Sequence, residues 1–402
     1  MSTSPDSGRI QVDAEEGRYD RQNLITWWDQ SRLRRARVLV VGAGALGNEI
    51  VKNLLLVGVG VVIVVDLDVV ENSNLSRCVF FRAEDEGRPK AMALAERAAD
   101  LNPDVEVIPV VGDVRLAIGL AAFAEVDVVI GGLDNREARL FVNQACWKTT
   151  TPWIDGAIEG LMGVAKVFIP PDTACYECTL SERDHELLSA RRTCAMLTRE
   201  DMLAGKTPTT ATTSSVIAGL QVQEAIKLLH ADRLGEPTLA GGGFQFVGLT
   251  HESYLVRYGR REDCLSHDTY ERELVTVVDH DLTFAELLVM ARTQLGPKAV
   301  VELEHEMVLS ASCQRCDLTE ELMCPVDSLD AGAGLCPRCG EQRRLEFAHT
   351  IDSESPLLAH TAKDLGLPAG DYVVAREGFA RRFYSLSAPG TALDLLREQA
   401  VA

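Results

Sequence analysis

The chain has 402 residues and a formal net charge of −20 at pH 7. A chain of this length can bury a large core in two or three domains. Its acidic excess argues against unaided binding to nucleic acids or anionic membranes, whose phosphates repel it. No apolar run reaches the roughly twenty residues of a membrane-crossing helix. We therefore expect a cytoplasmic protein with no nucleic-acid partner and no membrane partner.

The N-terminal residues 1–16 are polar and acidic and contain no hydrophobic segment. We expect them to form a flexible tail rather than a signal peptide or an anchor. The first distinctive motif, Arg-Tyr-Asp-Arg-Gln, follows at residues 18–22.

A glycine-rich turn comes directly after the first predicted strand, Val38–Val41. Gly42, Gly44 and Gly47 let the backbone approach a phosphate or ribose at the start of a helix, where free N–H groups favour negative charge. Asp66 ends the next apolar run about twenty residues further on, where a ribose-binding acid belongs. The pattern predicts a bound nucleotide, and by default it would indicate a dinucleotide dehydrogenase.

The residues that follow favour a triphosphate over a dinucleotide. Asn74 and Arg77 offer an amide and a guanidinium, which bond phosphate oxygens and neutralise developing charge. Lys90 begins a predicted helix, and Asp134 follows another buried strand, where a carboxylate suits Mg²⁺. Each residue alone could be a solvated side chain or a helix cap. Together, in this order, they predict phosphate chemistry at one site.

Five motifs in this order resemble the ThiF/MoeB and ubiquitin-activating (E1-like) superfamily, over roughly residues 17–268. They are Arg-Tyr-Asp-Arg-Gln at 18–22, Gly-x-Gly-x-x-Gly at 42–47, Asp-x-Asp-x-Val-Glu-x-Ser-Asn-Leu-x-Arg at 66–77, Gly-x-Pro-Lys at 87–90 and Leu-Asp-Asn at 133–135. The resemblance implies ATP-dependent adenylation of the C-terminal glycine of a ubiquitin-like or β-grasp modifier protein.

The resemblance also implies roles for single residues. The nucleotide and its phosphates would be bound by Gly42, Gly44, Gly47, Asp66, Asp68, Asn74, Arg77 and Lys90. Asp134 would carry Mg²⁺, and Arg21 would reach the γ-phosphate from the partner subunit, which implies a homodimer. One position departs from the family: the residue after Arg77 is usually Gln and here is Cys78. This is either a packing change beside the site or a lost phosphate contact.

The strands of this region predict its fold class. Short apolar runs occur at Val38–Val41, Val61–Val65, Val105–Val111, Val126–Ile130 and Val164–Ile169. Continuous apolarity is typical of parallel strands that are buried on both faces. We therefore expect an α/β fold, with a Rossmann-like doubly wound sheet in an adenylation domain at 17–268. A crossover loop would lie at about 179–212. A helix at Val216–Leu229 would be buried either in the core or at a subunit interface.

The eleven cysteines point to metal binding and catalysis rather than disulfides, because their number is odd and we find no export signal. Two Cys-x-x-Cys pairs, Cys313/Cys316 and Cys336/Cys339, predict a zinc ribbon over 313–339. Cys175 and Cys178 form another pair, which in the resembled family is usually completed by a second pair after the last strand. Here Cys264 and His267 would complete a tetrahedral Zn²⁺ set, unless these two residues are incidental.

Cys194 decides between two branches of the superfamily. Arg191 and Arg192 precede it and should lower the pKa of its thiol, which favours the nucleophilic thiolate. Its position matches the crossover loop where related enzymes carry their reactive cysteine. We expect it to form a thioester with the modifier, although sulfur-carrier adenylyltransferases also have a cysteine nearby.

Residues 269–402 are predicted to form a C-terminal α+β domain that contains the zinc ribbon. Its expected strands are Leu274–Val278, Val300–Leu303, Met307–Leu309 and Tyr372–Arg376. A capping box at Thr283–Glu286 opens a helix that ends at Gly296. The end of the chain looks like a β-grasp module, which favours recruitment of a conjugating (E2-like) enzyme. The resemblance is then closest to activating enzymes of bacterial ubiquitin-like conjugation systems.

The sequence thus predicts adenylation of a ubiquitin-like protein, thioester formation on Cys194 and transfer to a conjugating enzyme. Two other functions stay open. The chain could be a sulfur-carrier-protein adenylyltransferase without an obligatory thioester, or a non-catalytic scaffold, given Cys78. Arg21, Lys90 and Asp134 argue against the scaffold because a protein without catalysis has no need of them.

Overall fold

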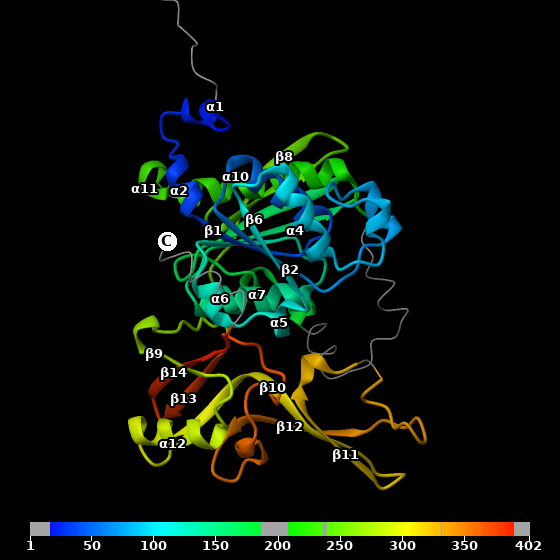
Figure 1. Ribbon diagram of the computed structural model, residues 1–402, viewed down its shortest axis with the longest axis vertical. Helices are drawn as coiled ribbons and strands as arrows, with labels where there is room; N and C mark the ends of the chain where they lie inside the picture. The colour runs from blue at the N-terminus through cyan, green and yellow to red at the C-terminus, as the bar shows by residue number, and fades with distance from the viewer. Residues whose placement is uncertain (1–16, 186–207, 236–238, 331, 390–402) are drawn as a thin grey trace, which may run out of the picture.

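The computed structural model describes residues 17–185, 208–235, 239–330 and 332–389, which form two β-sheets (Figure 1). The larger sheet has the strand order β3-β2-β1-β4-β5-β6-β7-β8. Its strands are β1 (Arg37–Val41), β2 (Val61–Asp66), β3 (Glu106–Val111), β4 (Val128–Gly131), β5 (Trp153–Glu159), β6 (Met162–Phe168), β7 (Gly242–Val247) and β8 (Glu252–Arg257). Strands β1 to β5 pair in parallel, and β6 to β8 extend the sheet by antiparallel pairing. The expected α/β fold is confirmed, with a mixed sheet.

The prediction of a parallel strand at Val164–Ile169 was wrong. That segment is β6, which pairs antiparallel with β5, and the parallel strand is β5 itself. Strand β5 escaped the sequence analysis because Asp155 and Glu159 interrupt its apolar run. Only Gly160 and Leu161 separate the two strands, a loop length typical of an antiparallel hairpin.

Helices cover both faces of the larger sheet, which explains its continuous apolar strands. One face carries α3 (Ala45–Val57), α4 (Lys90–Leu101) and α10 (Ala211–Leu229), and the other carries α5 (Val114–Ala117), α6 (Leu120–Ala124) and α7 (Arg136–Lys148). Alternate residues of β1 pack on opposite faces of the sheet. Val38 and Val40 lie in the apolar core under α3, α4 and α10, and Leu39 and Val41 lie in the core under α5, α6 and α7.

The remaining helices are short, apart from one in the C-terminal part. They are α1 (Asp20–Asn23), α2 (Gln30–Arg35), α11 (Ala231–Leu234) and α12 (Phe284–Leu295), together with the 3-10 turns η1 (Asn72–Ser76), η2 (Ala83–Asp85), η3 (Glu177–Thr179), η4 (Arg272–Leu274), η5 (Val326–Ser328) and η6 (Pro356–Ala359). No helix in the described ranges has both the length and the apolar character that crossing a membrane requires.

The second sheet has the order β11-β10-β13-β14-β9, and β12 also pairs with β10. Its strands are β9 (Val275–Asp279), β10 (Val300–Cys313), β11 (Leu318–Pro325), β12 (Arg344–Ile351), β13 (Tyr372–Glu377) and β14 (Ala380–Ser387). The segments predicted as two short strands, Val300–Leu303 and Met307–Leu309, do form strand, but their separation was wrong, because both belong to the single strand β10. Glu304 and Glu306 interrupt the apolar pattern there, and the pairing with β12 shifts register at the same place.

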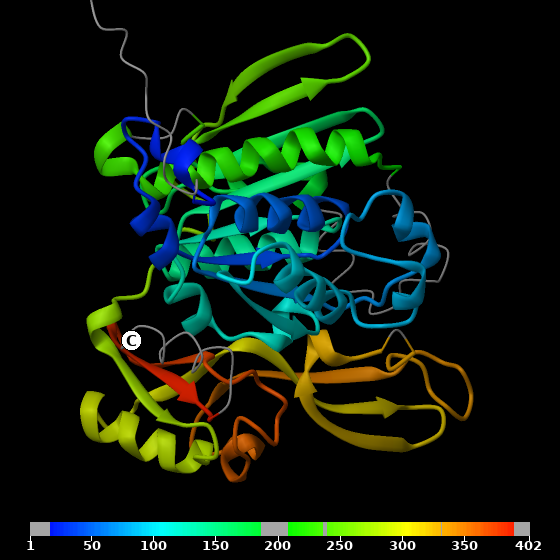
Figure 2. The same cartoon turned by 45° about the horizontal axis from the view of Figure 1, so that its top comes forward.

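Figure 1 labels α5, α6 and α7 between the two sheets, and the turned view in Figure 2 shows the same arrangement. Tyr372 and Phe383 of the second sheet belong to the same apolar cluster as Phe123 of α6. The backbone N–H of Ala121 donates to the Gly370 carbonyl over 2.8 Å. The second sheet is therefore packed against the helical layer that includes α7, the helix that follows Asp134.

Candidate nucleotide and metal sites

The glycine-rich turn and Asp66 form one hydrogen-bonded unit. The Asp66 carboxylate accepts the Ala43 N–H at 2.6 Å and the Asp68 N–H at 2.8 Å. Gly42 has φ +99°, and a Cβ there would lie 2.7 Å from the Gly132 carbonyl, so the turn requires glycine. Gly44 caps α3 and faces open space. A backbone cradle at the start of a helix is thus free to receive an anionic ligand.

Burial raises the pKa of Asp66, and the nearby Lys90 and the two backbone N–H groups offset only part of this effect. The Nζ atom of Lys90 lies 2.7 Å from Oδ2 of Asp68, and the Lys90 side chain is buried. Burial lowers the pKa of Lys90, but the charges of Asp66 and Asp68 outweigh it and the net pKa is raised. Lys90 therefore stays a cation beside the turn.

The other predicted phosphate ligands lie in and beside η1. Asn74 is buried, and its Oδ1 accepts the Glu71 N–H at 2.9 Å, which fixes the turn. Arg77 donates to the Ser73 carbonyl at 2.6 Å. Cys78 belongs to the apolar core, where burial raises the pKa of its thiol to about 11. Its surroundings are those of a packing residue.

Asn48, which was not predicted from the sequence, connects the two halves of this site. Its Nδ2 donates to the carbonyls of Ala43 and Gly44, at 2.7 and 3.1 Å, and its Oδ1 accepts the Phe80 N–H at 3.0 Å. The side chain is fully buried. Asn48 thus ties the glycine-rich turn to the segment after Arg77. A polar residue directly after Gly47 was the available signal.

Asp134 lies between β4 and α7, so it leaves the sheet at the same carboxyl edge as the glycine-rich turn. Its carboxylate is exposed. Arg139, one turn into α7, donates to the Leu133 carbonyl and pairs with the buried Asp155 at 3.0 Å. This buried pair, which sequence analysis also missed, holds the Asp134 loop against β5.

Arg21 is the one predicted phosphate ligand that the structure places elsewhere. Its segment binds the far ends of two helices: Asn102, the C-cap of α4, donates to Tyr19 Oη at 2.8 Å, and Gln22 donates to the Leu56 carbonyl at 3.4 Å. The 13-residue α3 is about 20 Å long at about 1.5 Å per residue. That length separates the anchor of Arg21 from the glycine-rich turn of its own chain.

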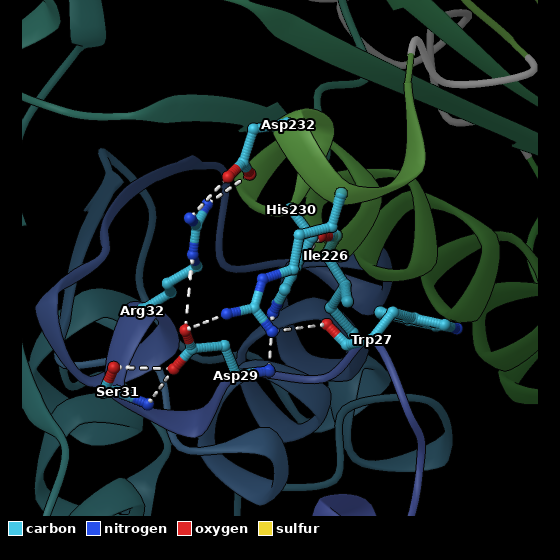
Figure 3. A network of polar contacts seen from close by, with 8 residues as sticks. Trp27, Asp29, Ser31, Arg32, Ile226, His230 and Asp232 are labelled. Carbon is cyan, nitrogen blue, oxygen red and sulfur yellow. Dashed lines mark hydrogen bonds and ion pairs between the residues drawn. The ribbon is translucent and has the colours of Figure 1, made fainter.

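Figure 3 shows how the following segment is attached to the end of α10. Arg32 pairs with Asp232 at 2.5 and 2.6 Å, and Arg233 donates to Asp29 at 2.9 Å. His230 is fully buried and accepts the Asp29 N–H at its Nε2, while its Nδ1 faces the Ile226 carbonyl at 2.8 Å. This pattern of hydrogen bonds needs the neutral ring with its proton on Nδ1. These contacts hold the segment around Asp29 against the C-terminal end of α10.

The first cysteine group brings Cys175, Cys178, Cys264 and His267 together, with all four donor atoms within 4.8 Å of one another. Sulfur atoms of Cys175 and Cys264 are 3.5 Å apart, close to the about 3.8 Å expected between two thiolates that bind one Zn²⁺. The His267 ring stacks on Trp147 at 4.3 Å, and its Nε2 faces Cys178. The donor set fits a structural Zn²⁺.

The second group unites Cys313, Cys316, Cys336 and Cys339, again within 4.8 Å. Cys313 ends β10, and its sulfur lies 3.6 Å from that of Cys339. This donor set also fits Zn²⁺, while the identity of the ion stays a prediction. The predicted nucleophile Cys194 lies outside the described residues, as does most of the crossover loop.

The fold and these positions define an α/β protein whose larger sheet carries a glycine-rich turn, Asp66, Lys90 and Asp134 at its carboxyl edge. A model of the ThiF family matches residues 19–266. The chain therefore belongs to the ThiF family, and the resemblance drawn from its motifs is confirmed.

Among curated relatives, the human ubiquitin-like modifier-activating enzyme 7 is 38% identical over 192 residues, covering 44% of this chain and 19% of that protein. The SAMP-activating enzyme E1 of Haloferax volcanii is 42% identical over 153 residues, covering 38% and 56%. The sulfur carrier protein ThiS adenylyltransferase of Bacillus subtilis is 37% identical over 169 residues, covering 41% and 50%. The aligned part thus spans between a fifth and just over half of these relatives.

Among solved structures, E. coli MccB with ATP superposes with a TM-score of 0.52 at 23% identity. The match covers 65% of this chain and 76% of that one. At this identity the similarity shows a shared fold.

Proposed function

We propose that this chain activates a ubiquitin-like protein by ATP-dependent adenylation of its C-terminal glycine and then holds it as a thioester on Cys194. The observation that carries this proposal is the gathering of the Gly42–Gly47 turn, Asp66, Lys90 and Asp134 at one edge of the larger sheet. The names of the aligned relatives, which include activating enzymes for ubiquitin-like proteins, support the same chemistry.

In this proposal each residue has a defined task. The turn and Asp66 bind the nucleoside, and Lys90 and Arg77 neutralise charge on the phosphates as the modifier's carboxylate attacks the α-phosphate. Asp134 would hold Mg²⁺, which neutralises phosphate charge when bound. Asn48 and the Arg139–Asp155 pair keep these groups in place. The two Zn²⁺ ions would stabilise their loops without touching the nucleotide.

A homodimer would complete the site. Tyr19 and Gln22, on either side of Arg21, are anchored at the far ends of α3 and α4, away from the glycine-rich turn of the same chain. In a symmetric dimer the same segment would reach the γ-phosphate of the partner's nucleotide. Transfer of the thioester would then need a conjugating (E2-like) enzyme, for which the C-terminal domain is the proposed recruiting module.

The second candidate is a sulfur-carrier-protein adenylyltransferase, favoured by the match to the ThiS adenylyltransferase. Adenylation would be the same, and Cys194 would not form an obligatory thioester. A pyrophosphate-exchange assay tests the shared step: ³²P-pyrophosphate should enter ATP only when Mg²⁺ and a glycine-terminated β-grasp protein are both present. Asp134→Ala should abolish exchange, and undiminished exchange in that variant would remove Asp134 from the site.

A further inference from the structure

The loop between β3 and α5, residues 112–113, continues the line of the proposed nucleotide site. The strand order β3-β2-β1 places the end of β3 beside Asp66, which in turn lies beside the glycine-rich turn after β1. Val111, the last residue of β3, is in register with Asp66, and the Gly112 N–H donates to the Asp66 carbonyl at 3.0 Å. A nucleotide with its phosphates at the turn and its ribose at Asp66 therefore carries its base toward this loop.

Two exposed apolar side chains mark the same place. Val111 is 48% exposed, and Leu67, directly after Asp66, is 58% exposed. Register neighbours on adjacent strands project to the same face of a sheet, so the Val111 side chain shares its face with the Asp66 carboxylate. The flat, largely apolar base of a nucleotide gains free energy by covering such side chains. The end of β3 thus offers contacts for the base.

Arg115 holds the 112–113 loop in one shape. The Asp113 carboxylate caps α5 by accepting the backbone N–H of Arg115 at 3.0 Å, and it also accepts from Nε and Nη2 of the same residue at 3.0 and 2.6 Å. A contact through two parallel hydrogen bonds fixes both side chains. Gly112 has φ +149°, and a Cβ there would lie 2.8 Å from Ala117 Cβ, so the loop also lies close against α5.

The same guanidinium connects this loop to the C-terminal domain. Nη1 of Arg115 donates to Oδ1 of Asp327 in η5, which lies 212 residues further along the chain. The side chains of Arg115 and Asp327 are only 25% and 32% exposed. Partly buried ion pairs are screened less by salt than exposed ones. One ion pair thus joins the loop beside the nucleotide to the segment between β11 and the second cysteine pair of the predicted zinc ribbon.

We propose that Arg115 and Asp327 are positioning residues through which the C-terminal domain sets the affinity for ATP. This rests on the proposed function. Asp327 holds the Arg115 guanidinium, Arg115 holds Asp113, and the 112–113 loop keeps the shape that receives the base. Because the coupling between two sites acts equally in both directions, bound ATP also stabilises η5. The C-terminal domain therefore takes part in nucleotide binding without touching the nucleotide.

Calorimetry tests this coupling with Asp327→Asn, which keeps the side-chain shape and removes its charge. The Kd for ATP, measured without a protein substrate, should rise at least about threefold, as expected for losing one partly buried ion pair that acts through a loop. Arg115→Met should weaken ATP binding at least as much, and the double variant should bind no more weakly than Arg115→Met, because both changes break the same contact. Asp330→Asn, at an exposed aspartate three residues after Asp327, should bind ATP as the wild type does. Equal ATP affinity in Asp327→Asn and Asp330→Asn would overturn the proposal.

Hydrogen exchange followed by mass spectrometry separates this proposal from the proposed function. On addition of saturating ATP to the wild-type chain, peptides that contain η5 should exchange their amide hydrogens more slowly. Asp327→Asn should lose this protection, while peptides from the start of α3 stay protected and show that ATP is bound. Hydrogen exchange at η5 that ATP leaves unchanged in the wild type would refute the coupling, even if pyrophosphate exchange occurs. Protection of η5 without any pyrophosphate exchange would refute the adenylation alone.

Discussion

The backbone N–H of Ala43 donates to Oδ2 of Asp66 over 2.6 Å, which joins the glycine-rich turn to the end of β2. The second carboxylate oxygen accepts the Asp68 N–H. Both oxygens are thereby fixed in place before a nucleotide arrives. A ribose that binds Asp66 meets an acceptor whose position is already set by two separate pieces of backbone.

Asp66→Asn is expected to weaken ATP binding. The amide can accept from Ala43 with its oxygen, but its NH₂ group then faces the Asp68 N–H, and a charged acceptor for the ribose is lost. Because hydrogen bonds to charged groups contribute about 1.5–3 kcal/mol, the Kd for ATP measured by calorimetry should rise at least about tenfold. Asp100→Asn, at the exposed end of α4, is the matched control. Equal ATP affinity in both variants would contradict the assignment of Asp66.

The placement of Arg21 predicts complementation between inactive subunits. Arg21→Ala and Asp134→Ala homodimers should each be inactive in pyrophosphate exchange. Mixed and reassembled in equal amounts, they should recover about a quarter of wild-type activity, because half of the dimers are mixed and each has one intact site when the interface is twofold symmetric. If Arg21 acted within its own chain, the mixture would stay inactive.

The cysteine groups predict two Zn²⁺ ions per chain. Cys264→Ser and Cys339→Ser should each reduce the zinc content from two to one, measured by mass spectrometry of the purified protein, and each should lower the melting temperature, since the bound metal stabilises its own loop. Cys324→Ser lies outside both groups and should keep both ions. A chain with one Zn²⁺ that is unaffected by Cys264→Ser would contradict the first site.

A buried ion pair in the second sheet predicts pH-dependent stability. His305 Nε2 lies 3.2 Å from Asp371 Oδ2, and Asp371 Oδ1 accepts the Leu120 N–H at 3.4 Å. Burial lowers the pKa of His305, but the hydrogen bond and charge of Asp371, with help from Glu304 and Asp327, outweigh it and leave the pKa raised.

Because the folded pKa of His305 is above the unfolded one, its stabilising contribution is complete below about pH 6.5 and is lost as the pH rises through the raised value. Urea unfolding should therefore give a lower free energy of unfolding at pH 8 than at pH 6. His305→Gln should reduce that difference. An identical pH dependence in His305→Gln would exclude His305 as its source.

Much of the larger sheet was predictable, because buried parallel strands leave continuous apolar runs such as Val61–Val65 in the sequence. The glycine-rich turn and the cation beside it were predictable for a related reason: Gly42 and Lys90 belong to short local patterns. The contacts that organise the site were not. Asn48 acts through a hydrogen bond to Phe80, 32 residues away, and Arg139 acts through Asp155 on another strand. No local sequence pattern indicates hydrogen-bond partners that lie so far apart in the chain.

The two cysteine groups also differ in how far the sequence alone could predict them. Cys313 and Cys316 lie close in sequence to their partner pair and were recognised by spacing alone. Cys175 and Cys264 are 89 residues apart, and only the family pattern suggested that they meet. Strand β5 was not predicted because the charged residue Asp155 interrupts its apolar run. Asp155 can be buried because it accepts a hydrogen bond from Arg139 of α7, and the strand's own sequence does not indicate that partner.

The proposed function is tested most directly by incubating the chain with ATP, Mg²⁺ and its cognate glycine-terminated β-grasp protein, and by following pyrophosphate exchange and covalent adducts together. We predict modifier-dependent exchange, together with an adduct that collapses on addition of a thiol reductant. Cys194→Ala should lose the adduct and keep the exchange, because adenylation precedes the use of the thiol. Exchange with an adduct that persists in Cys194→Ala, or with none in the wild type, would contradict the thioester step. No exchange with any such protein would contradict the adenylation itself.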